Sequence, residues 1–341
     1  MKSATFMSFL TLSAGYVFQP ENETDFRNPN IPGLFNYTES QFDISTGSSY
    51  WISSYITGND GRQYMALSHL LTTHSPSPVC RSSIIDLELK EYWVDLTYCT
   101  STNGSGFDNG KPLNADYGTY AFGSTSDDSV SSMYAYAHTD KGFSIDLEWN
   151  LTSRVMLNGG TGIIPFGNVP VNATEWGVPA GRTTGTITVN NKTIAVNPCS
   201  SFTWYDRQLS HGAPKNWTWF EINFPGSDVK ASVWAYDLIG DESTRFATVR
   251  SGNSYHVVAY DLEPDYTKTW TSPKSNITYP LSWNLNFENG DHLLIESIRP
   301  DQEMYGDKAL VDSAYEGFVK VRGSFYGQEE GFGVAELVSV Y

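Results

Sequence analysis

The sequence has little positive charge and lacks long apolar runs. Lys and Arg number 21 among 341 residues, against 38 Asp and Glu, which gives a formal net charge of −17 at pH 7. Nucleic-acid binding needs a basic stripe that displaces counterions, and anionic membrane surfaces attract basic segments, so we expect neither partner. A membrane-spanning helix needs about 20 consecutive apolar residues, and the sequence contains no such run.

Cysteine is also scarce, with 3 residues in the whole chain. Cys80 and Cys99 flank the strand-like stretch Ile84 to Leu96. A sheet would bring the two ends of this stretch together, so the spacing predicts a Cys80–Cys99 disulfide. Cys199 is then unpaired, and we expect it to be buried. No Cys and His cluster has the spacing of metal ligands, so we expect no metal site.

Asn-X-Ser/Thr triplets are frequent, which favours a route through the secretory pathway or an extracellular location. A Thr-rich β protein also accumulates such triplets without modification, and this alternative stays open. Lys2 and the apolar-leaning stretch Phe6 to Phe18 resemble a weak secretory signal, although the stretch also fits a strand of the mature protein. The candidate glycosylation sites are Asn22, Asn36, Asn103, Asn150, Asn172, Asn191, Asn216 and Asn276.

Apolar and polar residues alternate along most of the chain, and helical periodicity is nearly absent. Turn sequences such as Asn109-Gly110 and Asn289-Gly290 separate the alternating runs at short intervals, as in antiparallel meanders. We therefore expect an all-β fold with strands near residues 50–57, 64–71, 134–137, 142–151, 184–189, 201–208, 217–224, 231–238, 254–261, 281–287, 292–298, 316–325 and 333–340.

A length of 341 residues exceeds the usual size of a single domain, so we expect two cores. Closing each sheet removes its exposed edges, which predicts two packed antiparallel β-barrels. The segment Gly159 to Asn197 is rich in Gly, Pro, Thr and Asn, and we expect irregular structure there. The expected boundary lies near residue 200, give or take about 25, with one barrel in residues 1–200 and the other in 201–341.

The densest polar and aromatic cluster lies around residue 210. We expect residues 201–208 and 217–224 to pair as a hairpin whose loop carries His211. Alternation sorts the side chains of these strands into faces. The first strand places Trp204, Asp206 and Gln208 on one face and Tyr205 and Arg207 on the other, and the second places Trp217, Trp219 and Glu221 together.

An ionised Asp206 or Arg207 inside an aromatic core costs on the order of several kcal/mol unless it is paired. In one interpretation, the two residues brace the loop between the strands. In the other, Asp206 is a general acid with a raised pKa, and Arg207 and His211 donate hydrogen bonds to a substrate oxygen.

A second cluster joins residues 48–55 to residues 64–69 across the turn Asn59-Asp60-Gly61. Trp51 and Tyr55 share one face of the first strand, and His69 lies on an apolar face of the second. A lone His in a strand is more often structural than catalytic, and both roles stay open. The sequence contains no nucleophile elbow, Walker loop or dinucleotide fingerprint, so we expect no cofactor.

Several motifs together resemble one known family, the AttH-like group that contains kievitone hydratase and hydroxyneurosporene synthase. The motifs span most of the chain. They are Ser49-Tyr50-Trp51-X-Ser53-Ser54, Asp60-Gly61-X-X-Tyr64, Ser68-His69, Trp204-Tyr205-Asp206-Arg207-Gln208, Asn216-Trp217-Thr218-Trp219-Phe220, Tyr315-Glu316-Gly317-X-Val319-X-Val321-X-Gly323 and Gly331-X-Gly333-X-Ala335-Glu336-Leu337.

The resemblance implies two lipocalin-like barrels, a pocket at or near their junction, and no cofactor. Similar fungal proteins include secreted hydratases of prenylated phenolics, epoxide-opening cyclases, and Diels–Alder or hetero-Diels–Alder cyclases. A shared fold fixes the scaffold far better than the reaction. The resemblance therefore leaves the reaction open.

The chain departs from the family pattern close to the motifs. It has Tyr50 where the family usually has Trp, and Leu209-Ser210 where the family has Trp-Gly. These changes indicate a reshaped pocket and favour a cofactor-independent cyclase or pericyclase that folds an apolar polyketide- or terpenoid-type substrate of fungal secondary metabolism. The alternatives are a hydratase or epoxide-opening cyclase that uses Asp206 as a general acid, and a non-catalytic lipocalin-like carrier.

In each case the expected partner is an apolar small molecule, and whether the chain forms a homodimer stays open. The candidate catalytic residues are Asp206, Arg207, His69 and His211. The candidate substrate-binding residues are Trp51, Tyr55, Tyr205, Gln208, Trp217, Trp219, Trp234 and Tyr236.

Overall fold

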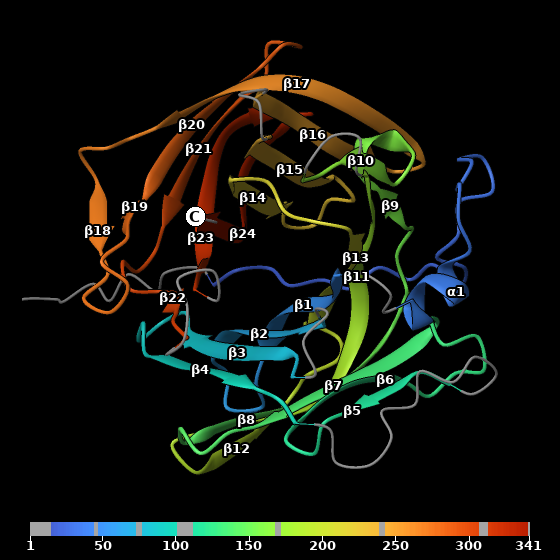
Figure 1. Cartoon of the computed structure of the whole chain (residues 1–341), viewed down its shortest axis with the longest axis vertical. Helices are drawn as coiled ribbons and strands as arrows, with labels where there is room; N and C mark the ends of the chain where they lie inside the picture. Colours follow the sequence, from blue (N-terminus) through green and yellow to red (C-terminus); the bar gives the residue numbers. More distant parts are fainter. Residues whose placement is uncertain are drawn as a thin grey trace, which may run out of the picture.

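Two large β-sheets, built from successive parts of the chain, pack against each other (Figure 1). The structure is a computed structural model and describes residues 15–43, 47–72, 77–100, 112–167, 172–238, 243–306 and 313–339. Helical structure in these residues is confined to α1 (Tyr37–Phe42) and a 3-10 turn (Asn158–Gly160), and no described helix has the length and apolarity to span a membrane. The expected all-β class is confirmed.

The first sheet is curled and open, with the order β4-β3-β2-β1-β13-β11-β8-β7-β6-β5 and three short strands paired to β11. Its core lies inside the curl. Its strands are β1 (Gly47–Thr57), β2 (Gln63–Thr72), β3 (Val79–Asp86), β4 (Tyr92–Tyr98), β5 (Asn114–Asp116), β6 (Tyr120–Ser124), β7 (Ser132–His138), β8 (Phe143–Asn150), β9 (Met156–Leu157), β10 (Ile163–Pro165), β11 (Asn172–Val189), β12 (Lys192–Ala195) and β13 (Phe202–Ser210).

The second sheet closes into an eight-stranded barrel, because β21 pairs with both β20 and β23. Its strands are β14 (Asn216–Asn223), β15 (Lys230–Asp237), β16 (Ser243–Ser251), β17 (Ser254–Pro264), β20 (Ser282–Phe287), β21 (His292–Ser297), β23 (Ala314–Phe325) and β24 (Gln328–Ser339), with the short β22 (Glu303–Met304) on β23. A separate ribbon pairs β18 (Thr269–Thr271) with β19 (Thr278–Pro280).

Burial patterns show where the two sheets meet. Along β8 buried and more exposed residues alternate, as expected for a strand with one face in solvent. Along β3 every residue is buried, because one face points into the curl and the other faces the barrel or is covered by neighbouring elements. Strands with both faces covered lie at the contact between the sheets, and they carry most of the candidate site residues.

The predicted hairpin of residues 201–208 with 217–224 is wrong. β13 pairs with β1 and β11, whereas β14 pairs with β15 and β24. Residues 211–215 carry the chain from one sheet to the other. As a result β13 belongs to the first sheet, although a boundary at residue 200 assigns it to the second part of the chain.

The irregular structure expected between Gly159 and Asn197 is also largely wrong, because β11 occupies residues 172–189 and β12 follows it. Two glycines of β11 allow the neighbouring strand β8 to approach closely. A Cβ on Gly181 would lie 2.7 Å from the carbonyl oxygen of Asn150, and one on Gly185 would lie 2.1 Å from that of Asp146. Glycine is therefore required where neighbouring strands approach closely, a use that composition does not distinguish from a loop.

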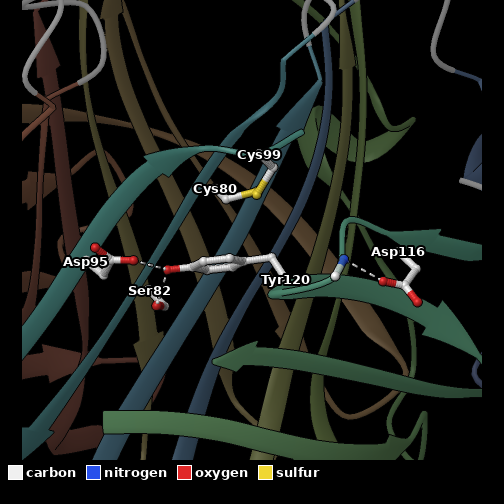
Figure 2. Close-up of a disulfide and its surroundings, with 7 residues drawn as sticks. Cys80, Ser82, Asp95, Cys99, Asp116 and Tyr120 are labelled. Atoms are coloured by element: carbon white, nitrogen blue, oxygen red, sulfur yellow. Dashed lines mark hydrogen bonds between the residues drawn. A yellow bond between two sulfur atoms is a disulfide. The ribbon is translucent and has the colours of Figure 1, made fainter. Parts of the chain in front are cut away.

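A disulfide and a buried tyrosine hold the edge of the curled sheet (Figure 2). Cys80 in β3 and Cys99 after β4 form the disulfide. The Tyr120 hydroxyl, from β6 near the opposite edge, donates to Asp95 Oδ2 at 2.8 Å and lies 2.9 Å from Ser82 Oγ. These side-chain hydrogen bonds connect strands near the two open edges of the curled sheet, which do not pair through their backbones in the described structure.

Replacing Cys80 and Cys99 together by alanine is expected to lower the free energy of unfolding by about 3 kcal/mol, since the disulfide closes a loop with a sequence separation of 19. Urea unfolding of the variant and of the wild-type protein measures the difference. A variant as stable as the oxidised wild type would show that the disulfide contributes nothing to stability.

The third cysteine and the glycosylation candidates lie on the surface. Cys199 is exposed and outside any disulfide, so the expectation that it is buried is wrong. Cys199 lies in the surface segment that directly precedes β13. Asn103 and residues 6–14 of the signal-like stretch Phe6 to Phe18 lie outside the described residues. The remaining acceptors are all exposed: Asn22, Asn36, Asn150, Asn172, Asn191, Asn216 and Asn276.

Candidate functional site

A cavity of about 130 Å³ lies between the outer face of the curled sheet and the outer face of the barrel. We call it the interface cavity. It lies outside the cores that fill the curl and the barrel. Its lining residues are Ser49, Trp51, His69, Leu71, Val79, Arg81, Phe166, Asp206, Gln208, Ser210, Ala213, Trp217, Trp219, Trp234, Glu336 and Val338.

Four indole rings line the interface cavity, and each is fixed by a hydrogen bond from its N–H group. Trp51 donates to Glu316 at 2.9 Å, and Trp217 donates to Glu336 at 2.9 Å. Trp219 donates to Ser232 at 2.8 Å, and Trp234 donates to Glu175 at 3.0 Å. Because each donor is satisfied within the protein, the rings offer the cavity an apolar and aromatic surface.

Asp206 is a buried ionisable residue of the cavity wall, next to the indole of Trp204. It lies on β13, is 9% exposed, and its Oδ1 atom has no hydrogen bond among the described residues. Burial raises the pKa of its carboxyl well above the usual range, and the nearby carboxyls of Glu221 and Glu336 raise it further. These effects favour the protonated form of Asp206.

Gly177 on β11 makes room for this carboxyl. It is the direct neighbour of Asp206 in the β11–β13 ladder. A Cβ at residue 177 would lie 2.8 Å from Asp206 Oδ1, which is too close for a carbon atom. Any residue larger than glycine would push the carboxyl out of its position.

Three further buried carboxyls surround Asp206. Burial raises the pKa of Glu175 well above its usual range, with Asp206 as the next cause. The pKa of Glu221 and that of Glu336 are each raised to about 7, in both cases mainly by burial. Glu221 is held by Ser53, Tyr55 and Asn223 and does not line the cavity, whereas Glu336 does.

An ion pair and a histidine form another part of the cavity wall. Arg81 Nε lies 3.1 Å from Glu316 Oε1, across the contact between the two sheets, and donates to His69 Nδ1 at 2.8 Å. An arginine cannot accept a hydrogen bond, so His69 Nδ1 carries no proton. The His69 proton is then on Nε2, which lies 2.8 Å from Ser49 Oγ and donates to it. Burial, and then Arg81, hold the pKa of His69 well below its usual range, so the ring is neutral.

This arrangement directs the hydroxyl proton of Ser49 away from His69. Since Ser49 Oγ accepts from His69, its own O–H is available to donate into the cavity that it lines. A water molecule or a substrate oxygen can accept that bond. No group of three His, Cys, Asp or Glu residues suited to a metal ion occurs in the part of the chain that the structure describes.

The structure brings together most of the predicted site residues at the cavity, namely Trp51, His69, Asp206, Gln208, Trp217, Trp219 and Trp234. Five others lie outside its lining. Arg207 and Tyr205 point into the curl, where the guanidinium donates to the carbonyls of Ser40, Asp43, Ser49 and Gln208. His211 is exposed in the loop after β13. Tyr55 and Tyr236 pack behind the cavity wall.

Several residues that shape the site are not among the candidates predicted from the sequence. Arg81 and Glu175 belong to none of the predicted clusters, and Ser49, Glu316 and Glu336 belong only to the family motifs. A signal was present, because each charged residue of this set interrupts a strand of mainly apolar or small residues. In a strand with both faces covered, such a residue must be paired or functional.

Known proteins with similar sequences and structures agree with this architecture. The AttH-like family model matches residues 79–340. Kievitone hydratase of Fusarium solani subsp. phaseoli is 37% identical over 95% of this chain and 91% of its own length. Dehydratase asqC of Emericella nidulans is 30% identical over 99% of each chain.

Solved structures give the same result. The crystal structure of kievitone hydratase from Nectria haematococca matches with a TM-score of 0.86 and 32% identity, and covers 95% of this chain and 98% of that one. An AttH protein from Nitrosomonas europaea matches with a TM-score of 0.71 and 16% identity, covering 92% and 98%, and shares the fold.

The curated relatives are enzymes that add or remove water, which supports the hydratase alternative better than the cyclase reading that the departures near Asp206 favoured. The predicted fold and the predicted family are confirmed. This chain is an enzyme and belongs to the AttH-like family.

Proposed function

We propose that the chain is a hydro-lyase that adds water to, or removes water from, an apolar small molecule bound in the interface cavity. The observation that carries the proposal is the Asp206 carboxyl, which is buried among indole rings and whose Oδ1 atom accepts no hydrogen bond from the described residues. A carboxyl that stays protonated near neutral pH acts as a general acid. The activities of the two relatives support the same chemistry.

In the hydration direction, the Asp206 O–H bond breaks and the proton forms a C–H bond with one alkene carbon. The other alkene carbon becomes cationic, and the neighbouring indoles stabilise the positive charge through their π-systems. Water then bonds to this carbon and loses one proton to the Glu336 carboxylate. Exchange with solvent returns Asp206 and Glu336 to their starting states, so the net change is the addition of one water. Dehydration is the reverse sequence.

Glu336 is suited to the role of base. Its Oε1 atom accepts the indole N–H of Trp217 at 2.9 Å, which fixes the carboxyl at the cavity wall. Its pKa is raised to about 7, mainly by burial and also by Glu316, so both protonation states are populated near neutral pH. A base with such a pKa accepts a proton readily and releases it again.

The test is incubation of the purified protein with kievitone, the compound named by the relative that is 37% identical, followed by chiral chromatography with mass detection. A product heavier by one water supports the proposal, as does loss of water from the hydrated compound. A product of unchanged mass would indicate cyclisation instead. Tight binding with no product would indicate a carrier.

The rate of hydration is expected to have a bell-shaped pH dependence. Below about pH 7, Glu336 takes up a proton and no longer accepts one from water, so kcat/KM falls with falling pH. At high pH Asp206 loses its proton, so kcat/KM falls again. Glu336→Gln should remove the acidic limb and lower the plateau. An acidic limb that is unchanged in this variant would contradict the assignment of Glu336 as the base.

We also propose that the protein follows the secretory pathway. The exposure of every described Asn-X-Ser/Thr acceptor supports this location, because a glycan needs a surface site. The Cys80–Cys99 disulfide supports it as well, since disulfides form and persist in oxidising compartments.

A further inference from the structure

A second cavity, of about 680 Å³, shares no lining residue with the interface cavity. Its walls come from residues 17–23, Arg154, the turn between β14 and β15, the C-terminal end of β16 with the turn after it, and parts of β13 and β24. Three buried phenylalanines, Phe202, Phe224 and Phe332, provide apolar wall. The cavity therefore has the volume and the surface to hold a small organic molecule.

Lys230, the first residue of β15, lines this cavity, and its ammonium group forms no ion pair with the described carboxylates nearest to it, those of Glu21, Glu221 and Asp228. The residue is 3% exposed. Among the described residues its Nζ forms no hydrogen bond and no ion pair, and it lies over the Phe202 ring, 5.4 Å from the centroid. A buried ammonium without a hydrogen-bonded partner is unfavourable, so this group is poised to receive an anion.

The acidic residues of the cavity wall do not fill this role, because two are engaged by arginines. Both terminal nitrogens of Arg250 bind the Glu21 carboxylate, and Arg154 pairs with Glu23 at 3.0 Å. Asp228 lines the cavity but forms no ion pair with Lys230. The Arg250 Nε atom is also buried without a hydrogen bond in the described residues, which adds a second donor that lacks an acceptor.

We propose that the second cavity binds a small amphipathic carboxylate, with its carboxylate on Lys230 and its apolar body against the three phenylalanines. Among the described residues of the cavity wall, Lys230 is the cation without a hydrogen-bonded acid, and a single negative charge matches it. A phosphate dianion would bring a second charge next to Glu21, Glu23 and Asp228, which the like-charge repulsion disfavours. The proposal concerns a site separate from the hydro-lyase chemistry and stands or falls independently of it.

The test is calorimetric titration of the full chain with decanoate, and with decanol as the neutral analogue. The wild-type protein is expected to bind decanoate at least about tenfold more tightly than Lys230→Met does, because a hydrogen bond to a charged group is lost. Lys230→Arg keeps the charge and should retain most of the affinity. Decanol should not distinguish the variants.

Two controls locate the binding. Lys320→Met removes an exposed lysine of β23 and should leave decanoate binding unchanged. Asp206→Asn alters the interface cavity and should also leave it unchanged. Wild-type binding of decanoate that is no tighter than that of decanol would overturn the proposal. Equal affinity in Lys230→Met, with native thermal stability, would overturn it as well.

Proton uptake on binding tests whether Lys230 contacts the ligand, because a purely structural Lys230 would not change its protonation when the ligand binds. Burial and then Arg250 lower the pKa of Lys230, against opposing effects of Glu21, Glu221 and Asp228, and the net value is about 8. At pH 8 about half of the amine is neutral, and a bound carboxylate draws a proton onto it. Titration in buffers of different ionisation enthalpy should show uptake of up to about half a proton in the wild type and none in Lys230→Met.

Discussion

Asp206→Asn is expected to lower kcat/KM for hydration by about 10²- to 10⁴-fold, which is the usual contribution of a general acid. The amide has almost the same shape as the carboxyl but holds no transferable proton. The thermal unfolding midpoint should not fall, because the neutral amide removes an acid that burial and the carboxyls of Glu221 and Glu336 already disfavour in its ionised form. Steady-state kinetics and a thermal melt of the same preparation measure both effects.

The matched control is Asp261→Asn, on an exposed position of β17, which should change neither quantity. Near-wild-type turnover by Asp206→Asn would remove Asp206 from the chemistry. If the product then had the same mass as its precursor, the reaction would be a cyclisation driven by the shape of the cavity.

Arg81→Met is expected to lower the free energy of unfolding by about 3–5 kcal/mol, because it leaves the Glu316 carboxylate buried without its ion-pair partner. The two side chains are only 6% and 0% exposed, and they join the curled sheet to the barrel. Methionine fills most of the space that the arginine stem occupies. Urea unfolding at neutral pH gives the difference from the wild-type protein.

The double variant Arg81→Met with Glu316→Gln should recover much of this loss, since a glutamine can still accept the indole N–H of Trp51. Lys192→Met breaks an ion pair of an exposed lysine and should cost no more than about 1 kcal/mol. A loss of stability in Arg81→Met no larger than in Lys192→Met would mean that the ion pair does not hold the two sheets together.

Alternation along the strands predicted the two faces of β13 correctly. Trp204, Asp206 and Gln208 do lie on one side, and Tyr205 and Arg207 on the other. Alternation does not say which side borders the cavity, because both faces of β13 are largely covered. Both sides of β13 carry aromatic and charged residues. The sequence therefore predicts Arg207 and Tyr205 as site residues, although they point into the curl.

The sequence also does not show which distant strands pair with each other. Residues 201–208 and 217–224 are close in sequence and would suit a hairpin, yet the intervening loop leads from one sheet to the other. The Arg81–Glu316 ion pair joins residues from opposite parts of the chain. A single sequence holds no measure of that proximity, whereas the Cys80–Cys99 disulfide lies within one β3–β4 hairpin and was accessible from spacing.

The position of the interface cavity, outside both hydrophobic cores, bears on how such enzymes diversify. Residues such as Leu71, Val79, Ala213 and Val338 line the cavity but are absent from the clusters that fill the curl and the barrel. A mutation at these positions can change the size of the accepted molecule while the folding of either half is preserved. Substitutions in the lining of the interface cavity can thus change the accepted substrate while both sheets still fold. Descendants of one ancestor can in this way acquire different reactions.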